Sequence, residues 1–210
     1  TTEIYPLSLH DALPISGISV LTEPTWFKGT LADMAGVRAA IEGMGNARPA
    51  VLRKDFIIDE YQVLEARVHG ADSVLLIVAS LGDDGLAALM DCSRDLGMEP
   101  LVEVNNSEEM VRAIASGAAV IGINNRDLRT FNVDLGTTDR LAGMVSGSVL
   151  LAALSGISAR EDVERFQAAG AGAVLVGESL MVAPDPGAKI RELRGAHDPR
   201  FTIHDSAATR

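Results

Sequence analysis

The sequence predicts an α/β protein whose parallel sheet curves into a TIM-type (β/α)8 barrel. From residue 17 onward, short apolar runs rich in β-branched residues alternate with amphipathic stretches, which is the order of consecutive βα units. Runs such as VLLIV and AVLVG are apolar throughout, as strands covered on both faces are. About seven units can be counted, and this number favours a barrel that lacks one of the usual eight units over an open doubly wound sheet.

The elements follow one another in a regular order. Strands are expected where β-branched and apolar residues cluster, at residues 17–22, 50–56, 71–78, 99–104, 119–125, 148–154 and 171–177. Helices are expected where apolar residues recur at helical spacing, at residues 30–44, 59–70, 82–97, 106–117, 134–145, 158–170 and 186–195. Four helices run into a glycine, which commonly ends a helix in a left-handed conformation: Gly70, Gly97, Gly117 and Gly170.

The missing unit is expected at the front of the chain. Residues 1–16, TTEIYPLSLHDALPIS, contain two prolines and are too few for a strand and a crossover helix. The run LHDALPI also matches one translation of a common sequencing adapter, so we expect residues 1–16 to be a non-native or disordered segment. The barrel domain is expected over residues 17–195, without its first strand and N-terminal extension, and a small, polar C-terminal tail over 196–210.

Composition limits the classes of partner. The 18 Lys and Arg residues against 29 Asp and Glu residues give a net charge of −11, which argues against binding to nucleic acid or to an anionic membrane. A small anion can still bind at backbone N–H groups. The single cysteine, Cys92, cannot form an internal disulfide, so we expect a buried, inert thiol and a cytoplasmic protein. No apolar run is long enough to span a bilayer.

Polar side chains near the ends of three predicted strands are the candidates for chemistry. Inward positions alternate along a barrel strand, and the C-terminal strand ends form the active-site mouth. Each such residue alone is more often a surface charge or half of an ion pair. A lysine and a carboxylate that converge in a semi-buried pocket can, however, act as general acid and base. Alternation directs Arg53 and Asp55 toward the helices and turns five polar residues toward the mouth: Lys54, Glu103, Asn105, Asn124 and Arg126.

Two glycine-containing turns at the end of the chain predict an anion site. SGIS at residues 155–158 and GES at 177–179 each follow a predicted strand. In barrels of this type the loops after strands 7 and 8 often hold phosphate. The last two units correspond to strands 7 and 8 if the missing unit is the first. One glycine-containing turn is weak evidence for phosphate binding, because tight turns need glycine anyway. Two such turns in adjacent final units indicate a phosphate site.

Long motifs in the chain resemble the indole-3-glycerol phosphate synthase family. The resemblance covers residues 17 to 195 and is carried by SVLTEPTWFKG, VLRKDFIIDEYQVLEARVHGADSVLLIVASL, PLVEVNNSEEM, IGINNRDLRTFNVDL and AGAVLVGESLM. It implies a monomeric barrel enzyme of tryptophan biosynthesis in its intact form. The implied substrate is a carboxyphenylamino-deoxyribulose phosphate, which loses carbon dioxide and water as the indole ring closes. The resemblance implies no metal and no organic cofactor.

The resemblance also implies roles for individual residues. Lys54 matches the family's general acid, which protonates the substrate carbonyl oxygen, and Glu103 matches a carboxylate that assists proton transfers. Asn124 matches a substrate-orienting residue, with Arg126 beside it, and Asn105 is also expected to bind substrate. The residues implied in the aromatic pocket are Phe27, Phe56 and Leu75. The residues implied in the phosphate-binding turns are Ser155, Gly156, Gly177 and Glu178.

The chain departs from the family pattern in two places. A first strand with a glutamate and a second catalytic lysine, in a KxSPS-like motif, is not found. The family's seventh strand ends in SESGI, whereas this chain reads Ala153-Leu154-Ser155-Gly156-Ile157, so Leu154 stands in the substrate site where the family has an active-site glutamate. Leucine cannot meet a polar partner in a water-poor site, which costs about 1–3 kcal/mol. We therefore expect impaired activity.

The missing first unit has a structural consequence and leaves two other functions open. The first and last strands should expose unpaired edges, which predicts an open, horseshoe-like barrel of marginal stability that can associate through those edges. One alternative function is an inactive barrel fragment that only binds a phosphate ligand or a partner. The other is a different sugar-phosphate enzyme of tryptophan or histidine biosynthesis, against which the Lys54 and Glu103 motifs argue.

Overall fold

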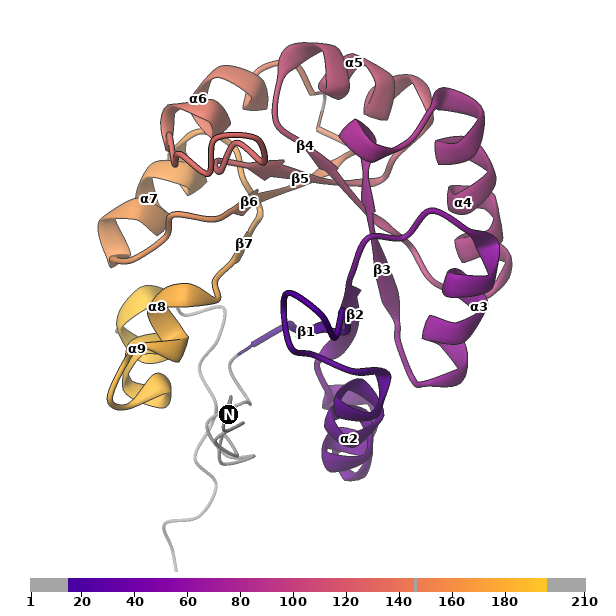
Figure 1. Ribbon diagram of the computed structural model, residues 1–210. Helices are drawn as coiled ribbons and strands as arrows, with labels where there is room; N and C mark the ends of the chain where they lie inside the picture. The colour runs from indigo at the N-terminus through magenta and orange to yellow at the C-terminus, as the bar shows by residue number, and fades with distance from the viewer. Residues whose placement is uncertain (1–14, 146, 196–210) are drawn as a thin grey trace, which may run out of the picture.

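The computed structural model describes residues 15–145 and 147–195, and its strands form one parallel sheet (Figure 1). The seven strands pair in sequence order, β1-β2-β3-β4-β5-β6-β7. All seven predicted strands are confirmed. Their bounds are β1 Gly17–Leu21, β2 Ala50–Lys54, β3 Ser73–Ile77, β4 Leu101–Val104, β5 Val120–Asn124, β6 Leu150–Leu154 and β7 Ala173–Leu175.

Helices cover the outside of the ring of strands, as Figure 1 shows. The seven predicted helices are confirmed as α2 Leu31–Ile41, α3 Glu60–Val68, α4 Asp83–Asp95, α5 Ser107–Ala115, α6 Gly136–Ala142, α7 Arg160–Ala168 and α9 Pro186–Arg194. The sequence did not predict the short helix α8, Glu178–Met181, or the 3-10 turns η1 Glu42–Ala47 and η2 Val78–Ser80.

Local signals fix the ends of the helices. The side chain of Asn106 accepts a hydrogen bond of 3.0 Å from the backbone N–H of Glu109 and so caps the start of α5. The predicted terminal glycines all have positive φ, between 75° and 104°, as a left-handed helix end requires: Gly70, Gly97, Gly117 and Gly170.

Alternation along the strands produces two apolar layers. Outward residues such as Val102 and Ile121 pack with helix residues such as Met90 and form the main core between sheet and helices. Inward residues form a smaller inner cluster of Leu75, Ile77, Leu101, Ala152 and Leu154, with Leu52, Val120, Ala173 and Leu175 against it. The inner cluster fills the barrel. The next inward residues toward the C-terminal ends of the strands, such as Glu103 two residues after Leu101, therefore lie at the mouth.

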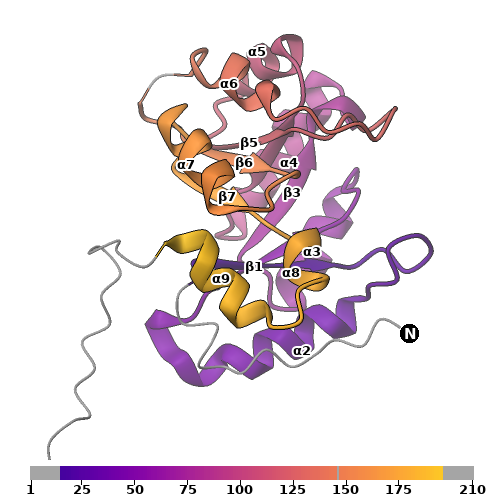
Figure 2. The same ribbon diagram turned by 90° about the vertical axis from the view of Figure 1, so that its left-hand side faces the viewer.

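The barrel is open between its first and last strands. In the part of the chain that the structure describes, β1 pairs only with β2 and β7 only with β6, and Figure 2 shows the molecule from the side of β7. The prediction of an open barrel is therefore confirmed. Of the segments 1–16 and 196–210, expected to lie outside the domain, all but residues 15 and 16 fall outside the described residues.

Candidate active site

Lys54 ends β2 and belongs to the inward face of that strand. Its neighbour Arg53 is buried and points the other way, donating to the backbone carbonyl of Gln62 at 2.8 Å and to Glu65 Oε2 at 2.9 Å on α3. Leu52, two residues earlier, packs against the inner cluster. The structure therefore directs Arg53 to the helix layer and leaves Lys54 at the barrel mouth, as the alternation predicts.

Glu103 and Asn124 meet inside the barrel. Both are buried, on β4 and β5, and Asn124 Nδ2 donates to Glu103 Oε1 at 2.8 Å. Burial raises the pKa of the Glu103 carboxyl, although the Asn124 hydrogen bond and the positive charge of Lys54 act in the opposite direction. A carboxyl group with a raised pKa beside a cationic lysine can hold or release a proton, which suits acid–base chemistry.

Asn105 and Arg126 complete this polar cluster, but their side chains are already engaged. Asn105 Nδ2 donates to the backbone carbonyls of Asn124 at 2.7 Å and Arg126 at 3.3 Å. The guanidinium of Arg126 donates to Glu178 Oε2 at 2.9 Å and so joins the loop after β5 to α8. Asn105 thus fixes the shape of the neighbouring loop, and its predicted contact with substrate stays a prediction.

Two phenylalanines face each other at the mouth. The ring centroids of Phe27 and Phe56 are 6.0 Å apart and the rings are tilted by 45°, and each side chain is 46% exposed. The Thr22 hydroxyl donates to Asp55 Oδ2 at 2.6 Å and joins the ends of β1 and β2. Leu75, the third predicted member of the pocket, lies apart from them in the inner cluster.

The turn after β6 has a strained, well-held backbone. Ser155 and Gly156 have φ values of 65° and 80°, and a Cβ at position 156 would lie 2.5 Å from Val133 Cγ1, so only glycine fits there. Asn125 Nδ2 donates to the carbonyls of Leu154 at 3.1 Å and Ser155 at 3.2 Å. Asn125 was not predicted as a functional residue, because its outward phase places it away from the mouth.

The second glycine turn lies against the first. Gly177 precedes α8, and the Ser179 hydroxyl donates to the carbonyl of Ile157 at 2.9 Å. This bond brings the loops after β6 and β7 together, as the predicted phosphate site requires. Of the residues predicted for phosphate binding, Ser155 and Gly156 lie in the turn after β6, and Gly177 and Glu178 lie at the start of α8, which this bond links to that turn.

Leu154 gives the inner face of β6 an apolar end. Its side chain is 3% exposed and belongs to the inner cluster, and the residue pairs in register with Asn124. A Cβ added to Gly122 would lie 2.7 Å from Leu154 Cδ1, so the leucine fills the space above that glycine. The wall beside the Glu103–Asn124 pair is therefore apolar at this position.

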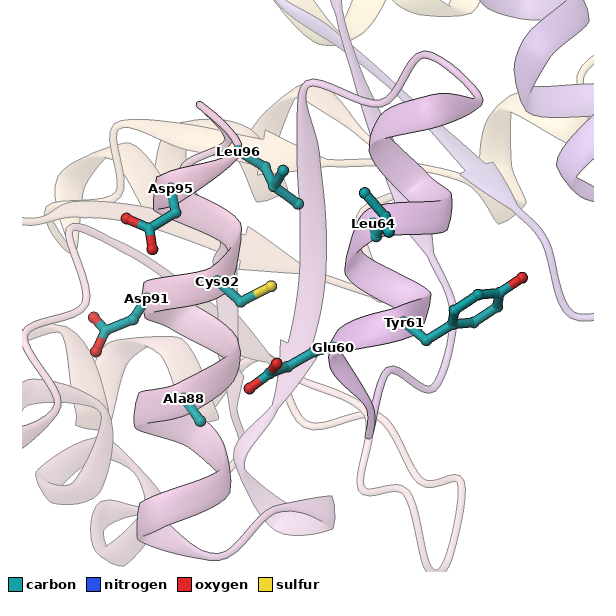
Figure 3. Close-up of a pocket in the computed structure, with 8 residues that line it drawn as sticks. All are labelled: Glu60, Tyr61, Leu64, Ala88, Asp91, Cys92, Asp95 and Leu96. Carbon is teal, nitrogen blue, oxygen red and sulfur yellow. The ribbon is translucent and has the colours of Figure 1, made fainter.

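A groove lies elsewhere, on the outer surface between α3 and α4 (Figure 3). It measures about 610 Å³ and is lined in part by Glu60, Asp91, Cys92 and Asp95. Burial raises the pKa of the Cys92 thiol, and the charges of Glu60 and Asp95 raise it further. A protonated thiol is a poor nucleophile, so this groove lacks the chemistry that the barrel mouth has.

Within residues 15–145 and 147–195, no three histidine, cysteine, aspartate or glutamate side chains come together in a way that could hold a metal ion. No helix in the same two segments is long and apolar enough to cross a membrane.

Comparison with known sequences decides the family. The family model described as indole-3-glycerol phosphate synthase matches residues 10–193. The chain belongs to the indole-3-glycerol phosphate synthase family. A protein of this name from Roseiflexus sp. is 50% identical over 182 residues, which cover 86% of this chain and 68% of the relative.

Longer relatives carry the same sequence within a larger protein. The multifunctional tryptophan biosynthesis protein of Schizosaccharomyces pombe is 62% identical over 178 residues, 85% of this chain. The chain spans only 23% of that protein's length. The match to the synthase family model begins at residue 10, inside the segment 1–16 that the sequence analysis set apart.

Solved structures agree on the fold of this synthase family member. A 3-hexulose-6-phosphate synthase from Salmonella typhimurium superposes with a TM-score of 0.68 at 16% identity, covering 83% of each chain. A thiamine phosphate pyrophosphorylase from Pyrococcus furiosus superposes with a TM-score of 0.65 at 17% identity, covering 88% of this chain and 84% of that one. At these identities the likeness concerns the barrel alone.

Proposed function

We propose that this chain forms the barrel of an enzyme that converts 1-(2-carboxyphenylamino)-1-deoxyribulose 5-phosphate to indole-3-glycerol phosphate. In this reaction the ring carbon that bears the carboxylate attacks the substrate carbonyl carbon, carbon dioxide leaves, and the resulting hydroxyl departs as water. The observation that carries the proposal is the buried hydrogen-bonded pair of Glu103 and Asn124. Lys54 belongs to the same inward face of the sheet, and its charge acts on the Glu103 carboxyl. Family membership makes this chemistry the first candidate.

Each step has a candidate group at the mouth. Lys54 would protonate the carbonyl oxygen as the new bond forms. Glu103, whose pKa is raised by burial, would take part in the proton transfers that follow, with Asn124 holding its carboxyl group in place. The flat apolar ring of the substrate suits the half-exposed pair of Phe27 and Phe56, and Leu75, in the inner cluster, is the third residue proposed for this site.

The phosphate end of the substrate would bind at the linked loops after β6 and β7. Ser155, Gly156, Gly177 and Glu178 would offer mainly backbone N–H groups, and Arg126 would lie near them through its ion pair with Glu178. A cytoplasmic location is also proposed, supported by the single free cysteine, Cys92.

Leu154 favours a second candidate function, a barrel that binds a sugar phosphate without closing the ring. The leucine is buried beside Asn124 and can neither accept a hydrogen bond nor take up a proton. A substrate hydroxyl aimed at this wall would lose its partner, at a cost of about 1–3 kcal/mol, which is a rate loss of about 5-fold to 150-fold.

Indole fluorescence during incubation with the substrate separates the two candidates. Slow indole formation by the unmodified chain, faster in Leu154→Glu and lost in Lys54→Met, is expected for the synthase. Lys189→Met on α9 is the matched control and should keep the rate. Tight substrate binding with no indole from either the unmodified chain or Leu154→Glu would instead support the binding function.

A further inference from the structure

The loop between β1 and α2 is organised by Glu23, which lies two residues after the end of β1. One carboxylate oxygen of Glu23 accepts from the backbone N–H of Thr25 at 2.8 Å. The other accepts from the N–H groups of Trp26 at 2.6 Å and Phe27 at 3.1 Å. Three successive backbone donors therefore converge on one side chain, and Figure 2 shows the loop projecting beyond the end of β1.

The rest of the loop has little freedom to adopt another shape. The backbone N–H of Gly29 donates to the carbonyl of Glu23 at 3.1 Å and closes the loop. A Cβ at Gly29 would lie 1.9 Å from the carbonyl oxygen of Leu21, so the chain returns tightly against the end of β1. Lys28 adopts a φ of 59°, an uncommon conformation for a residue other than glycine, and its Nζ donates to the carbonyl of Thr25 at 2.7 Å.

The position of Glu23 would otherwise suggest a catalytic carboxylate. It lies two residues beyond Leu21, at the strand end where barrels place reacting groups. Both of its oxygens, however, are already used by the loop. Desolvation is the largest single influence and opposes its ionisation, but the three N–H groups together outweigh it and hold the pKa of the Glu23 carboxyl below its usual range. A carboxylate stabilised in this way is a poor proton carrier.

We propose that Glu23 is a positioning residue, whose carboxylate sets the loop so that Phe27 lies against Phe56 at the mouth of the barrel. The inference rests on the proposed function, in which these two rings receive the aryl group of the substrate. Glu23 would thus hold the aryl site in its binding conformation before the substrate arrives. A preformed site avoids the ordering cost that a mobile loop pays on binding.

The structure supplies a direct reporter of this role. Trp26 is the single tryptophan of the chain, and its own backbone N–H makes the 2.6 Å bond to Glu23. Its side chain is 82% exposed, so its resonances report the loop and not the core. Amide hydrogen exchange of Thr25, Trp26 and Phe27 in the ¹⁵N-labelled full chain therefore measures the three bonds one by one.

The test compares Glu23→Ala and Glu23→Gln with the unmodified chain. In Glu23→Ala we expect exchange of the three amides to accelerate at least about tenfold, because each loses a charged acceptor, and the nuclear Overhauser contacts between Phe27 and Phe56 to weaken. Glu23→Gln keeps an oxygen acceptor and should lie in between. Glu108→Gln, an exposed carboxylate on α5, is the matched control and should change nothing in the loop.

Binding of 2-aminobenzoate, followed by its own fluorescence, supplies the second measurement. We expect its dissociation constant to rise about 3-fold to 10-fold in Glu23→Ala, as for loss of a preorganised contact. Unchanged amide exchange in Glu23→Ala, or an equal change in Glu108→Gln, would overturn the inference, and so would a loosened loop with unaltered 2-aminobenzoate affinity. If the unmodified chain fails to bind 2-aminobenzoate, the proposed function loses support, while the amide and ring measurements still decide the role of Glu23.

Discussion

Glu103 is the residue whose environment most opposes its usual charge. Its carboxyl group is 3% exposed, and burial raises its pKa. In the unfolded chain the same group ionises near pH 4.3, roughly the ordinary value for glutamate. Stability from Glu103 is therefore fully present below that pH and is lost as the pH rises through the higher folded-state pKa.

Replacing Glu103 by glutamine should stabilise the fold at neutral pH. Glutamine keeps an oxygen to accept from Asn124 and carries no charge to desolvate, so we expect a gain of about 1 kcal/mol in the free energy of unfolding at pH 7. The gain should vanish near pH 3, well below the roughly 4.3 of the unfolded state, where the carboxyl group is protonated in both states. Urea unfolding at the two pH values measures it, and ring closure should be lost. A variant less stable than the unmodified chain at pH 7 would contradict this assignment.

At the scale of elements, Asn125 joins three parts of the barrel. It follows β5, donates to the carbonyls of Leu154 and Ser155 after β6, and accepts from the N–H and hydroxyl of Thr138 on α6 at 3.1 and 2.9 Å. The bonds with Thr138 are buried, and the bond to Ser155 reaches the turn whose backbone is strained. A side chain remote from the mouth thus sets the shape of a predicted phosphate loop.

Removal of the Asn125 carboxamide should weaken both the fold and phosphate binding. Asn125→Ala leaves two carbonyls, a hydroxyl and a backbone N–H without this partner, and we expect a loss of about 2–4 kcal/mol in unfolding free energy. Inorganic phosphate, titrated calorimetrically, should bind more weakly because the turn is no longer held. Thr138→Val removes one hydroxyl and should cost about 1 kcal/mol with little change in phosphate affinity. Equal phosphate affinity in Asn125→Ala would contradict the proposed link.

The strands and most helices could be predicted because their signals are local. Parity along a strand places Lys54, Glu103 and Asn124 on one face once a single inward neighbour is known. Helix α8 was missed because four residues are too few to show a helical period. Glu23 and Asn125 were missed because their roles depend on backbone donors and acceptors that a loop or a neighbouring strand brings to them. The alternation of side chains along a strand does not predict such contacts.

At the scale of the whole molecule, the open edges of β1 and β7 are the feature that favours association with another chain. A closed barrel has no sheet edges, whereas in the described part of this chain β1 and β7 each pair on one side only. Apolar side chains on both edge strands are more than a third exposed, Leu21 at 37% and Val174 at 36%. Exposed apolar edges with unmet backbone groups can pair with another chain.

We therefore predict that the chain associates with rising concentration, and that a charge on β7 reduces this association. Val174→Lys places a lysine on the exposed side of the edge strand, where natural sheets use lysine to prevent pairing, and should weaken self-association about tenfold, which corresponds to about 1.4 kcal/mol. Val111→Lys is the matched control, because Val111 is 58% exposed on α5, away from both edges. Sedimentation velocity over a concentration series measures the effect. A monomer at every concentration, or an equal effect of Val111→Lys, would show that the open edges do not drive association.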